Sequence, residues 1–397
     1  MKLSFCIIVK NEEASLPRCL SSVKDLVDKI VVLDTGSTDK TVEIAKSFGA
    51  KVYYFEWCND FAAARNEALK YVQGDWVLVL DADEVLTPEI VPQIKQTIES
   101  DRYLVINLIR QEVGASQSPY SLVSRLFRNH PDMRFSRPYH AMVDDSVSEL
   151  LQREPNWQIV TLPDVAILHY GYQPEAIASL NKYARAQAAM EGFLATHPND
   201  PYDCSKLGAL YVQTGETSKG IELLEQGLKS ADIDPSVLYE LHYHLGNAYT
   251  RLDNPTQAAK HYQTAIQQPI LPKLKLGAYN NLGNLLMAAG DFANAEKAYQ
   301  TVLKIDSKLA LGYYNLGMSL KAMGRLRDAI ASYQHATKLH PEYAEAYQNL
   351  GVALLKIGNV IESVEAFRHA IALHQQHNPE EANRLRQGLL EMGFKVG

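Results

Sequence analysis

The sequence lacks the features that mark nucleic-acid binders, disulfide-bonded secreted proteins and membrane-spanning proteins. Its 397 residues carry a formal net charge of −7 and contain no basic run, which argues against a dedicated nucleic-acid-binding protein. The four cysteines are scattered singly without metal or redox spacing, so we expect reduced thiols and a cytoplasmic location. No apolar segment approaches the ~20 residues of a membrane-spanning helix, although peripheral attachment to a membrane stays open.

Several common catalytic motifs are also missing. The chain has no P-loop, no zinc-binding helix motif and no serine nucleophile elbow. The N-terminal stretch MKLSFCIIVKNEE has only a short apolar run before charged residues, so we interpret it as a first strand rather than a signal peptide. The chemistry must therefore come from other side chains.

Up to about residue 172, short apolar runs alternate with helical patterns. The runs are LSFCIIV, KIVVLD and DWVLVLD, and helices are expected over residues 15–26 and 38–48. This order predicts an α/β domain with a Rossmann-like, mostly parallel sheet covered by helices on both faces. Ligands of such sheets bind outside the carboxyl ends of the strands, where Asp34 and Asp81 are expected.

The stretch WVLVLDADE ends a buried strand with three carboxylates. Thr87, Pro88 and Glu89 already supply the start of the next helix, so Asp81 and Asp83 are not needed as its caps. Neighbouring carboxylates repel each other, and a divalent cation such as Mg²⁺ or Mn²⁺ would relieve that repulsion. A metal site is the preferred hypothesis, and a purely structural role for the acids is the alternative.

From about residue 200 the sequence becomes repetitive. Leu-Gly pairs recur with final spacings of 34 residues, and each of the later pairs is followed by a small residue and then an aromatic one. This pattern predicts an all-α solenoid of about five tetratricopeptide repeats over residues 200–378. We expect a linker helix over residues 173–199 and a capping helix over residues 379–397.

Four segments of the first 172 residues resemble family 2 glycosyltransferases with the GT-A fold. These segments are CIIVKNEEASLPRCLSSV, VVLDTGSTDKT, FAAARNEAL and VLVLDADE, which contains a D-x-D motif. Together with the repeats, the chain resembles bacterial tetratricopeptide-containing glycosyltransferases. The resemblance implies a nucleotide-sugar donor, with a UDP-sugar as the first candidate, a divalent cation and an inverting transfer.

The resemblance also implies roles for residues at the strand ends. Residues expected to hold the nucleotide are Val9, Asn11, Glu12, Asp34, Arg65 and Asp81, and Asp83 is expected to bind the metal. His169, in the segment LHYGY, matches a late histidine that meets the metal or diphosphate in related enzymes. From the residues alone there are alternatives: Asp34 could bind a loop backbone, Arg65 could pair with a surface acid, and His169 could be a half-buried structural residue.

The acceptor side departs from the family pattern. Related enzymes have a His-Glu pair whose carboxylate takes the acceptor's proton, but here Ala141 follows His140. Asp144 or Asp145 is the candidate replacement, with Asp144 preferred. The alternatives are that both are solvated loop acids, that activity is lost, or that the acceptor needs little activation.

Three asparagines directly precede Leu-Gly pairs in the repeats: Asn281, Asn315 and Asn349. Their spacing resembles the asparagine ladder of protein O-GlcNAc transferases and suggests a peptide groove, because a carboxamide both donates and accepts hydrogen bonds. A generic scaffold surface is the alternative interpretation.

The sequence thus predicts a metal-dependent inverting glycosyltransferase of the cytoplasm. Its acceptor would be a protein, a peptide or a saccharide, and the repeats would recruit that acceptor or a protein partner. One rival is a tetratricopeptide adaptor with a non-catalytic nucleotide-sugar-binding domain, which Ala141 favours. A nucleotidyltransferase is disfavoured because the first strand leads into KNEEASLPR, which lacks a glycine-rich basic loop.

Overall fold

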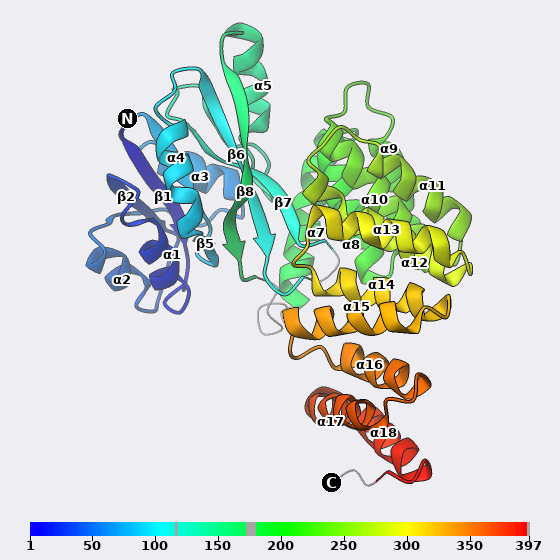
Figure 1. Ribbon diagram of the computed structural model, residues 1–397. Helices are drawn as coiled ribbons and strands as arrows, with labels where there is room; N and C mark the ends of the chain where they lie inside the picture. Colours follow the sequence, from blue (N-terminus) through cyan, green and yellow to red (C-terminus); the bar gives the residue numbers. More distant parts are fainter. Residues whose placement is uncertain (116–117, 172–179, 395–397) are drawn as a thin grey trace. The chain divides into compact units, whose positions relative to one another are not determined.

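The computed structural model describes residues 1–115, 118–171 and 180–394 (Figure 1). The chain forms two compact units. The first contains Met1–Ala115 and Pro119–Ala231, and the second contains Asp232–Gly397 together with Ser116–Ser118. Residues 180–199 of the predicted linker helix and most of the first predicted repeat therefore group with the α/β domain, and residues 173–179 of that predicted helix lie outside the described residues.

The first unit is built on an eight-stranded sheet in the order β3-β2-β1-β4-β7-β6-β8-β5. The strands are β1 (Leu3–Val9), β2 (Lys29–Asp34), β3 (Lys51–Tyr54), β4 (Trp76–Val79), β5 (Glu84–Leu86), β6 (Tyr103–Glu112), β7 (Tyr120–Arg128) and β8 (Gln158–His169). Strands β1 to β4 pair in parallel, as do β6 and β8, whereas β7 runs antiparallel to β4 and β6, and β5 antiparallel to β8. The mostly parallel sheet predicted from the sequence is confirmed.

Helices cover both faces of this sheet. On one face pack α1 (Leu16–Val23), α2 (Thr41–Ser47) and α4 (Val91–Thr97), and on the other α3 (Phe61–Leu69) and α5 (Asp144–Arg153). The two faces of β1 show why: Phe5 and Ile7 lie in one apolar cluster, and Cys6 lies in the other. Successive side chains of a strand point to opposite faces, so an unbroken apolar run needs cover on both.

The segment after the acidic stretch does not form one helix that starts at Pro88, as the sequence predicts. The short strand β5 begins at Glu84, and a 3₁₀ turn, η1 (Pro88–Ile90), precedes α4. Pro92 falls in the first turn of α4, where its missing N–H costs no helical hydrogen bond. The acids Asp81 and Asp83 lie between β4 and β5, at the carboxyl end of a central strand.

The remaining helices form antiparallel pairs. The first unit ends with α7 (Leu180–Thr196), α8 (Pro201–Thr214) and α9 (Thr217–Gly227). The second unit contains α10 (Pro235–Arg251), α11 (Pro255–Ile266), η2 (Pro272–Lys275), α12 (Leu276–Ala288), α13 (Phe292–Ile305), α14 (Ala310–Ala322), α15 (Leu326–Leu339), α16 (Ala344–Lys356), α17 (Val360–His377) and α18 (Pro379–Glu391) (Figure 1). Among the described residues, no helix is long and apolar enough to cross a membrane.

The glycines of the Leu-Gly pairs allow two helices of a repeat to pack closely. A methyl group added at Gly283 would lie 2.5 Å from the ring of Tyr299, and one at Gly317 would lie 2.6 Å from the ring of Tyr333. Glycine on the first helix of a pair therefore lets the aromatic ring of the second helix approach closely. Both tyrosines are almost fully buried, so this contact forms the centre of each repeat.

Candidate active site

A cavity of about 950 Å³ opens at the carboxyl ends of β1 and β4. One side carries three carboxylates, those of Glu12, Asp81 and Asp83. A second side is aromatic and consists of Trp57, Phe61 and Tyr139, whose rings meet edge to face at centroid distances of 4.8 and 5.7 Å. This size suits a ligand of several rings, and cavities of 300–1,000 Å³ are typical of small-molecule sites.

Asp81 is held between two arginines. Arg65 Nη2 donates to Oδ1 of Asp81 at 2.6 Å, and Arg125 Nη2 donates to Oδ2 at 2.9 Å. Burial alone would raise the pKa of the Asp81 carboxyl, but Arg125 and Arg65 more than offset this and hold the pKa well below its usual range. Asp81 is thus ionised, and its charge is matched locally. Nε and Nη1 of Arg65 are buried without a hydrogen-bond partner among the described residues.

A chain of alternating charges runs beneath Asp81. The fully buried Glu84 accepts the backbone N–H of Asp81 at 2.8 Å and a hydrogen bond from Arg110 Nη1 at 3.0 Å. Arg110 Nε also pairs with Glu112 Oε1 at 2.9 Å. Glu112 in turn contacts Nδ1 of His169. Glu84, the third acid of the WVLVLDADE stretch, therefore supports Asp81 from the protein interior.

His169 ends β8 and faces Asp83. Its Nε2 lies 3.2 Å from Oδ2 of Asp83, while Glu112 holds Nδ1 on the other side of the ring. Burial lowers the pKa of His169, but the hydrogen bonds to Asp83 and Glu112 outweigh it and raise the pKa to about 9. Gly171 leaves room beside this pair, because an added methyl carbon would lie 2.6 Å from Nε2 of His169 and 2.9 Å from Oδ2 of Asp83.

The residues predicted to hold a base and ribose come from the ends of β1 and β2. Val9 and Glu12 line the cavity. Asn11 has a left-handed backbone (φ 56) and its Oδ1 accepts the N–H of Thr38 at 2.8 Å. Asp34 is 3% exposed and accepts the backbone N–H groups of Gly36 and Ser37, as the loop-binding alternative expects. Asn11 and Asp34 therefore stabilise the loop after β2.

Glu12 is the acid of this group that reaches the cavity. Its backbone N–H donates to Thr41 Oγ1 at 2.7 Å, and its carboxylate accepts from the Ser15 hydroxyl. Burial raises the pKa of Glu12, the Ser15 hydrogen bond lowers it, and the nearby charges of Asp83 and Asp81 raise it further. The acidic side of the cavity therefore carries mutual repulsion that a cationic group would relieve.

The two candidate bases begin α5 and do not line the cavity. Oδ1 of Asp144 accepts the Ser124 hydroxyl at 2.9 Å, and burial raises the pKa of Asp144. Asp145 instead pairs with Arg137, a buried residue with left-handed backbone (φ 73) that also bonds Asp200 at 2.7 Å.

The position where related enzymes carry glutamate lies against the protein interior. Ala141 is partly buried and packs on the apolar cluster that α3 and α5 share. His140, beside it, is exposed and contacts the ring of Tyr139 edge to face at 4.7 Å. The methyl group of Ala141 thus contributes to packing, and alanine has no group that could take a proton from the acceptor.

The three asparagines of the repeats bond to the preceding repeat. Asn281 Nδ2 donates to Asn247 Oδ1 at 2.9 Å, and Asn315 Nδ2 donates to Asn280 Oδ1 at 2.6 Å. Asn349 Nδ2 donates to the hydroxyl of Tyr314 at 3.2 Å. A peptide bound to these side chains would have to replace the contacts between repeats.

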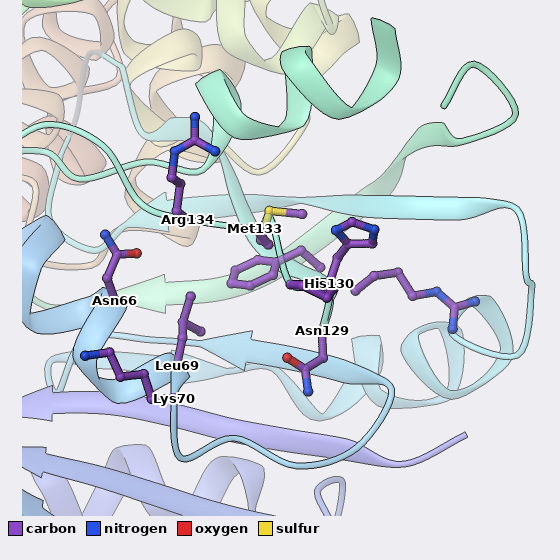
Figure 2. Close-up of a pocket in the computed structure, with 10 residues that line it drawn as sticks. Asn66, Leu69, Lys70, Asn129, His130, Met133 and Arg134 are labelled. Atoms are coloured by element: carbon purple, nitrogen blue, oxygen red, sulfur yellow. The ribbon is translucent and has the colours of Figure 1, made fainter. Parts of the chain in front are cut away.

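A second cavity, of about 300 Å³, lies between α3 and the segment after β7 (Figure 2). Its lining includes the basic side chains of Lys70, His130 and Arg134. Each of them pairs with an acid: Lys70 with Glu67 at 2.6 Å, Arg134 with Glu149 at 2.5 Å and His130 with Glu154 at 3.5 Å. This cavity contains none of the predicted site residues, so the larger cavity is the candidate active site.

Sequence reasoning missed the residues that support the acids. Arg110 and Glu112 lie on β6 and Arg125 lies on β7, and none of them belongs to a motif that can be recognised in the sequence. The one available signal was charge inside otherwise apolar strands, as in YLVINLIRQE. Such charges are seldom buried unless they are paired.

The fold and this cavity define an α/β domain of the glycosyltransferase type followed by helical repeats. Residues 4–160 match the family model "Glycosyl transferase family 2", and segments 239–268, 277–309, 319–358 and 344–381 match tetratricopeptide repeat models. The chain therefore belongs to the tetratricopeptide-containing proteins with a family 2 glycosyltransferase domain.

Two relatives and one solved structure illustrate what this chain is similar to. The chain is 46% identical over 297 residues to a "TPR repeat-containing protein" of Synechococcus elongatus, covering 75% of this chain and 74% of that protein. It is 30% identical over 199 residues to the "SPbeta prophage-derived glycosyltransferase SunS" of Bacillus subtilis, covering 49% of this chain and 46% of SunS. The crystal structure of YrrB, "a TPR protein with an unusual peptide-binding site", aligns with a TM-score of 0.41 and 19% identity, covering 51% of this chain and 100% of YrrB.

Proposed function

We propose that this protein is a metal-dependent, inverting glycosyltransferase that takes a sugar from a nucleotide-sugar donor, with a UDP-sugar as the first candidate. The observation that carries the proposal is the convergence of Asp81, Asp83 and Glu12 on one cavity, at the carboxyl ends of neighbouring parallel strands. Ligands of open α/β sheets bind at this edge.

Asp83 and His169 fit a divalent cation. Their oxygen and nitrogen lie 3.2 Å apart, Gly171 keeps the space beside them free, and Glu112 holds the second ring nitrogen of the histidine. A carboxylate behind a histidine is the usual support of a metal ligand. Among the described residues, no group of three or more His, Cys, Asp or Glu side chains is arranged to hold a metal. Diphosphate oxygens and water would complete the coordination of Mg²⁺ or Mn²⁺.

The chain's own residues would orient the donor. A bound cation would stabilise the charge that develops on the departing diphosphate. Asp81, kept ionised by Arg65 and Arg125, offers acceptor oxygens at the cavity wall, with 37% of its side chain exposed. Ribose hydroxyls are the matching donors. Because the two ion pairs with Arg65 and Arg125 fix the orientation of the Asp81 carboxylate, this carboxylate is pre-organised to accept hydrogen bonds.

Asp144 is the proposed base for the acceptor's hydroxyl, and because it does not line the cavity, the acceptor would have to bring its hydroxyl to this carboxylate from beside the donor. Burial raises its pKa, and a carboxylate with a raised pKa takes up a proton more readily near neutral pH. Asp145 is the second candidate, but it is engaged by the Arg137 guanidinium. The acceptor would be a protein, a peptide or a saccharide that the repeats recruit.

The deciding experiment measures turnover of nucleotide-sugars with and without Mn²⁺ for the full chain and for Asp83→Asn. We expect donor consumption by the unaltered protein, and loss of at least about a hundredfold in the variant, because the neutral amide lacks the charge that binds the cation. Glu89→Gln, an exposed acid on η1, is the matched control. Equal turnover in Asp83→Asn would refute the metal assignment. Nucleotide-sugar binding without any turnover would instead favour a non-catalytic sensor, which Ala141 supports.

A further inference from the structure

Part of the cavity wall comes from outside the glycosyltransferase family match. The match ends at residue 160, yet Arg185, Ala188 and Ala189 of α7 line the same cavity as Asp81 and Asp83. Residues spaced by three and four positions share one face of a helix. One face of α7 is therefore turned to the candidate active site, and α7 belongs to the same compact unit as the sheet.

This helix is fixed from its other side. Ala186, Met190 and Leu194 are buried in an apolar cluster with Cys204 and Leu207 of α8. Tyr139, which lines the cavity, also packs against this cluster. The position of Arg185 is thus set by helix packing and does not depend on its own contacts.

Arg185 is a cation in an acidic cavity, and it has no counter-ion among the residues that the structure describes. No hydrogen bond or ion pair joins its exposed guanidinium to any other residue in the described part of the chain. The acids nearest to the cavity already have partners: Asp81 has two arginines, Asp83 has His169, and Glu12 has the Ser15 hydroxyl. Arg185 is therefore available to an anionic ligand.

We propose that Arg185 binds the diphosphate of the donor, so that α7 is a wall of the donor site rather than a linker. This inference rests on the proposed function. A guanidinium presents paired N–H donors that match two phosphate oxygens, and it stays charged at all physiological pH values. Ala188 and Ala189, one turn further on, carry only methyl groups, so they let the ligand lie close to the helix.

The test uses the full chain with Mn²⁺ and begins with a thermal-shift screen of UDP, GDP, CDP and ADP. For the best of these, calorimetry gives the affinities of the nucleoside diphosphate and of the matching monophosphate. Arg185→Ala should reduce the preference for the diphosphate about tenfold, the usual effect of losing a charge-assisted hydrogen bond. Arg185→Lys should recover part of it. Gln187→Ala, on the same helix but outside the cavity lining, should match the unaltered protein.

Hydrogen exchange supplies a second measurement. The diphosphate should slow amide exchange across α7 in the unaltered protein and in Gln187→Ala, but not in Arg185→Ala. An unchanged preference and unchanged α7 protection in Arg185→Ala would overturn the inference and leave the proposed function intact. If the unaltered protein bound none of the four nucleotides, both proposals would fall.

Discussion

Nε2 of His169 lies 3.2 Å from Oδ2 of Asp83, although 86 positions separate the two residues in the chain. Strands β5 and β8 bring them together, because Glu84 pairs directly with His169 in that antiparallel ladder. The backbone strengthens this contact, since the N–H of Tyr170 donates to the carbonyl of Asp83 at 3.0 Å. The segments that contain Asp83 and His169 are far apart in the sequence, but in the structure they form one element.

Gly171→Ala should weaken activity without unfolding the domain. The new methyl group would lie 2.6 Å from Nε2 of His169 and 2.9 Å from Oδ2 of Asp83, so it would push these two side-chain ends apart. Displacements of about 1 Å in a site can cost about a hundredfold in rate. Turnover and melting temperature should be measured together.

Gly192→Ala is the matched control for that substitution. It lies on α7 with nothing within 4 Å of the new methyl group, and alanine favours a helix by about 1 kcal/mol over glycine. We expect unchanged activity and equal or higher stability. If Gly171→Ala retained full turnover, the proposed role of the Asp83–His169 pair would be wrong.

Asp144→Asn should slow sugar transfer about 10²- to 10⁴-fold while donor affinity stays unchanged, as expected for removal of a general base. Asp145→Asn is the comparison, because it removes the Arg137 ion pair and should lower stability more than the rate of chemistry. Single-turnover rates and donor affinities separate the two effects. Should both variants transfer sugar at the original rate, neither acid is the base.

Tyr299→Phe should destabilise the repeats by about 0.5–1.5 kcal/mol, the usual value of one hydrogen bond. Its hydroxyl donates to Asn284 Oδ1 at 2.7 Å, and Tyr262 makes the same contact with Asn247 at 2.8 Å. The next repeat has Met318 at the asparagine position, and the buried hydroxyl of Tyr333 has no partner among the described residues.

Tyr333→Phe is therefore expected to leave stability unchanged or to increase it, because it removes an unsatisfied buried group. Met318→Asn should stabilise the protein by restoring the missing partner. Urea unfolding followed by circular dichroism would compare the variants. An equal loss in Tyr299→Phe and Tyr333→Phe would contradict this account of the repeats.

The stability of the repeats should fall as the pH drops. Nδ1 of His242 on α10 lies 2.9 Å from Nδ1 of His261 on α11. Burial, with smaller effects of His261 and Lys260, lowers the pKa of His242 from 6.5 to about 4. The unfolded chain then binds more protons than the folded one between these values, so stability is lost as pH falls through this range. Urea unfolding at several pH values should show this decrease, and His242→Gln should reduce it. An unchanged pH dependence in the variant would exclude His242 as its source.

The sequence by itself determined the two kinds of architecture and the position of the acids. Apolar runs separated by helical patterns require a sheet covered on both faces, and glycines spaced by 34 residues require repeated close helix packing. These features depend on spacings along the chain, which do not require knowing which distant segments meet in space. The D-x-D acids at the end of β4 follow from the same local pattern.

Only the tertiary structure decided which distant charges meet. Asp81 lies between Arg65 and Arg125, and Glu112 reaches His169, because pairing of strands and packing of helices fix these distances. The same holds for Arg185, whose helix the sequence assigned to a linker. Local patterns set which face of a helix or strand is apolar, but the partners of a buried charge depend on strand order, which no local pattern contains.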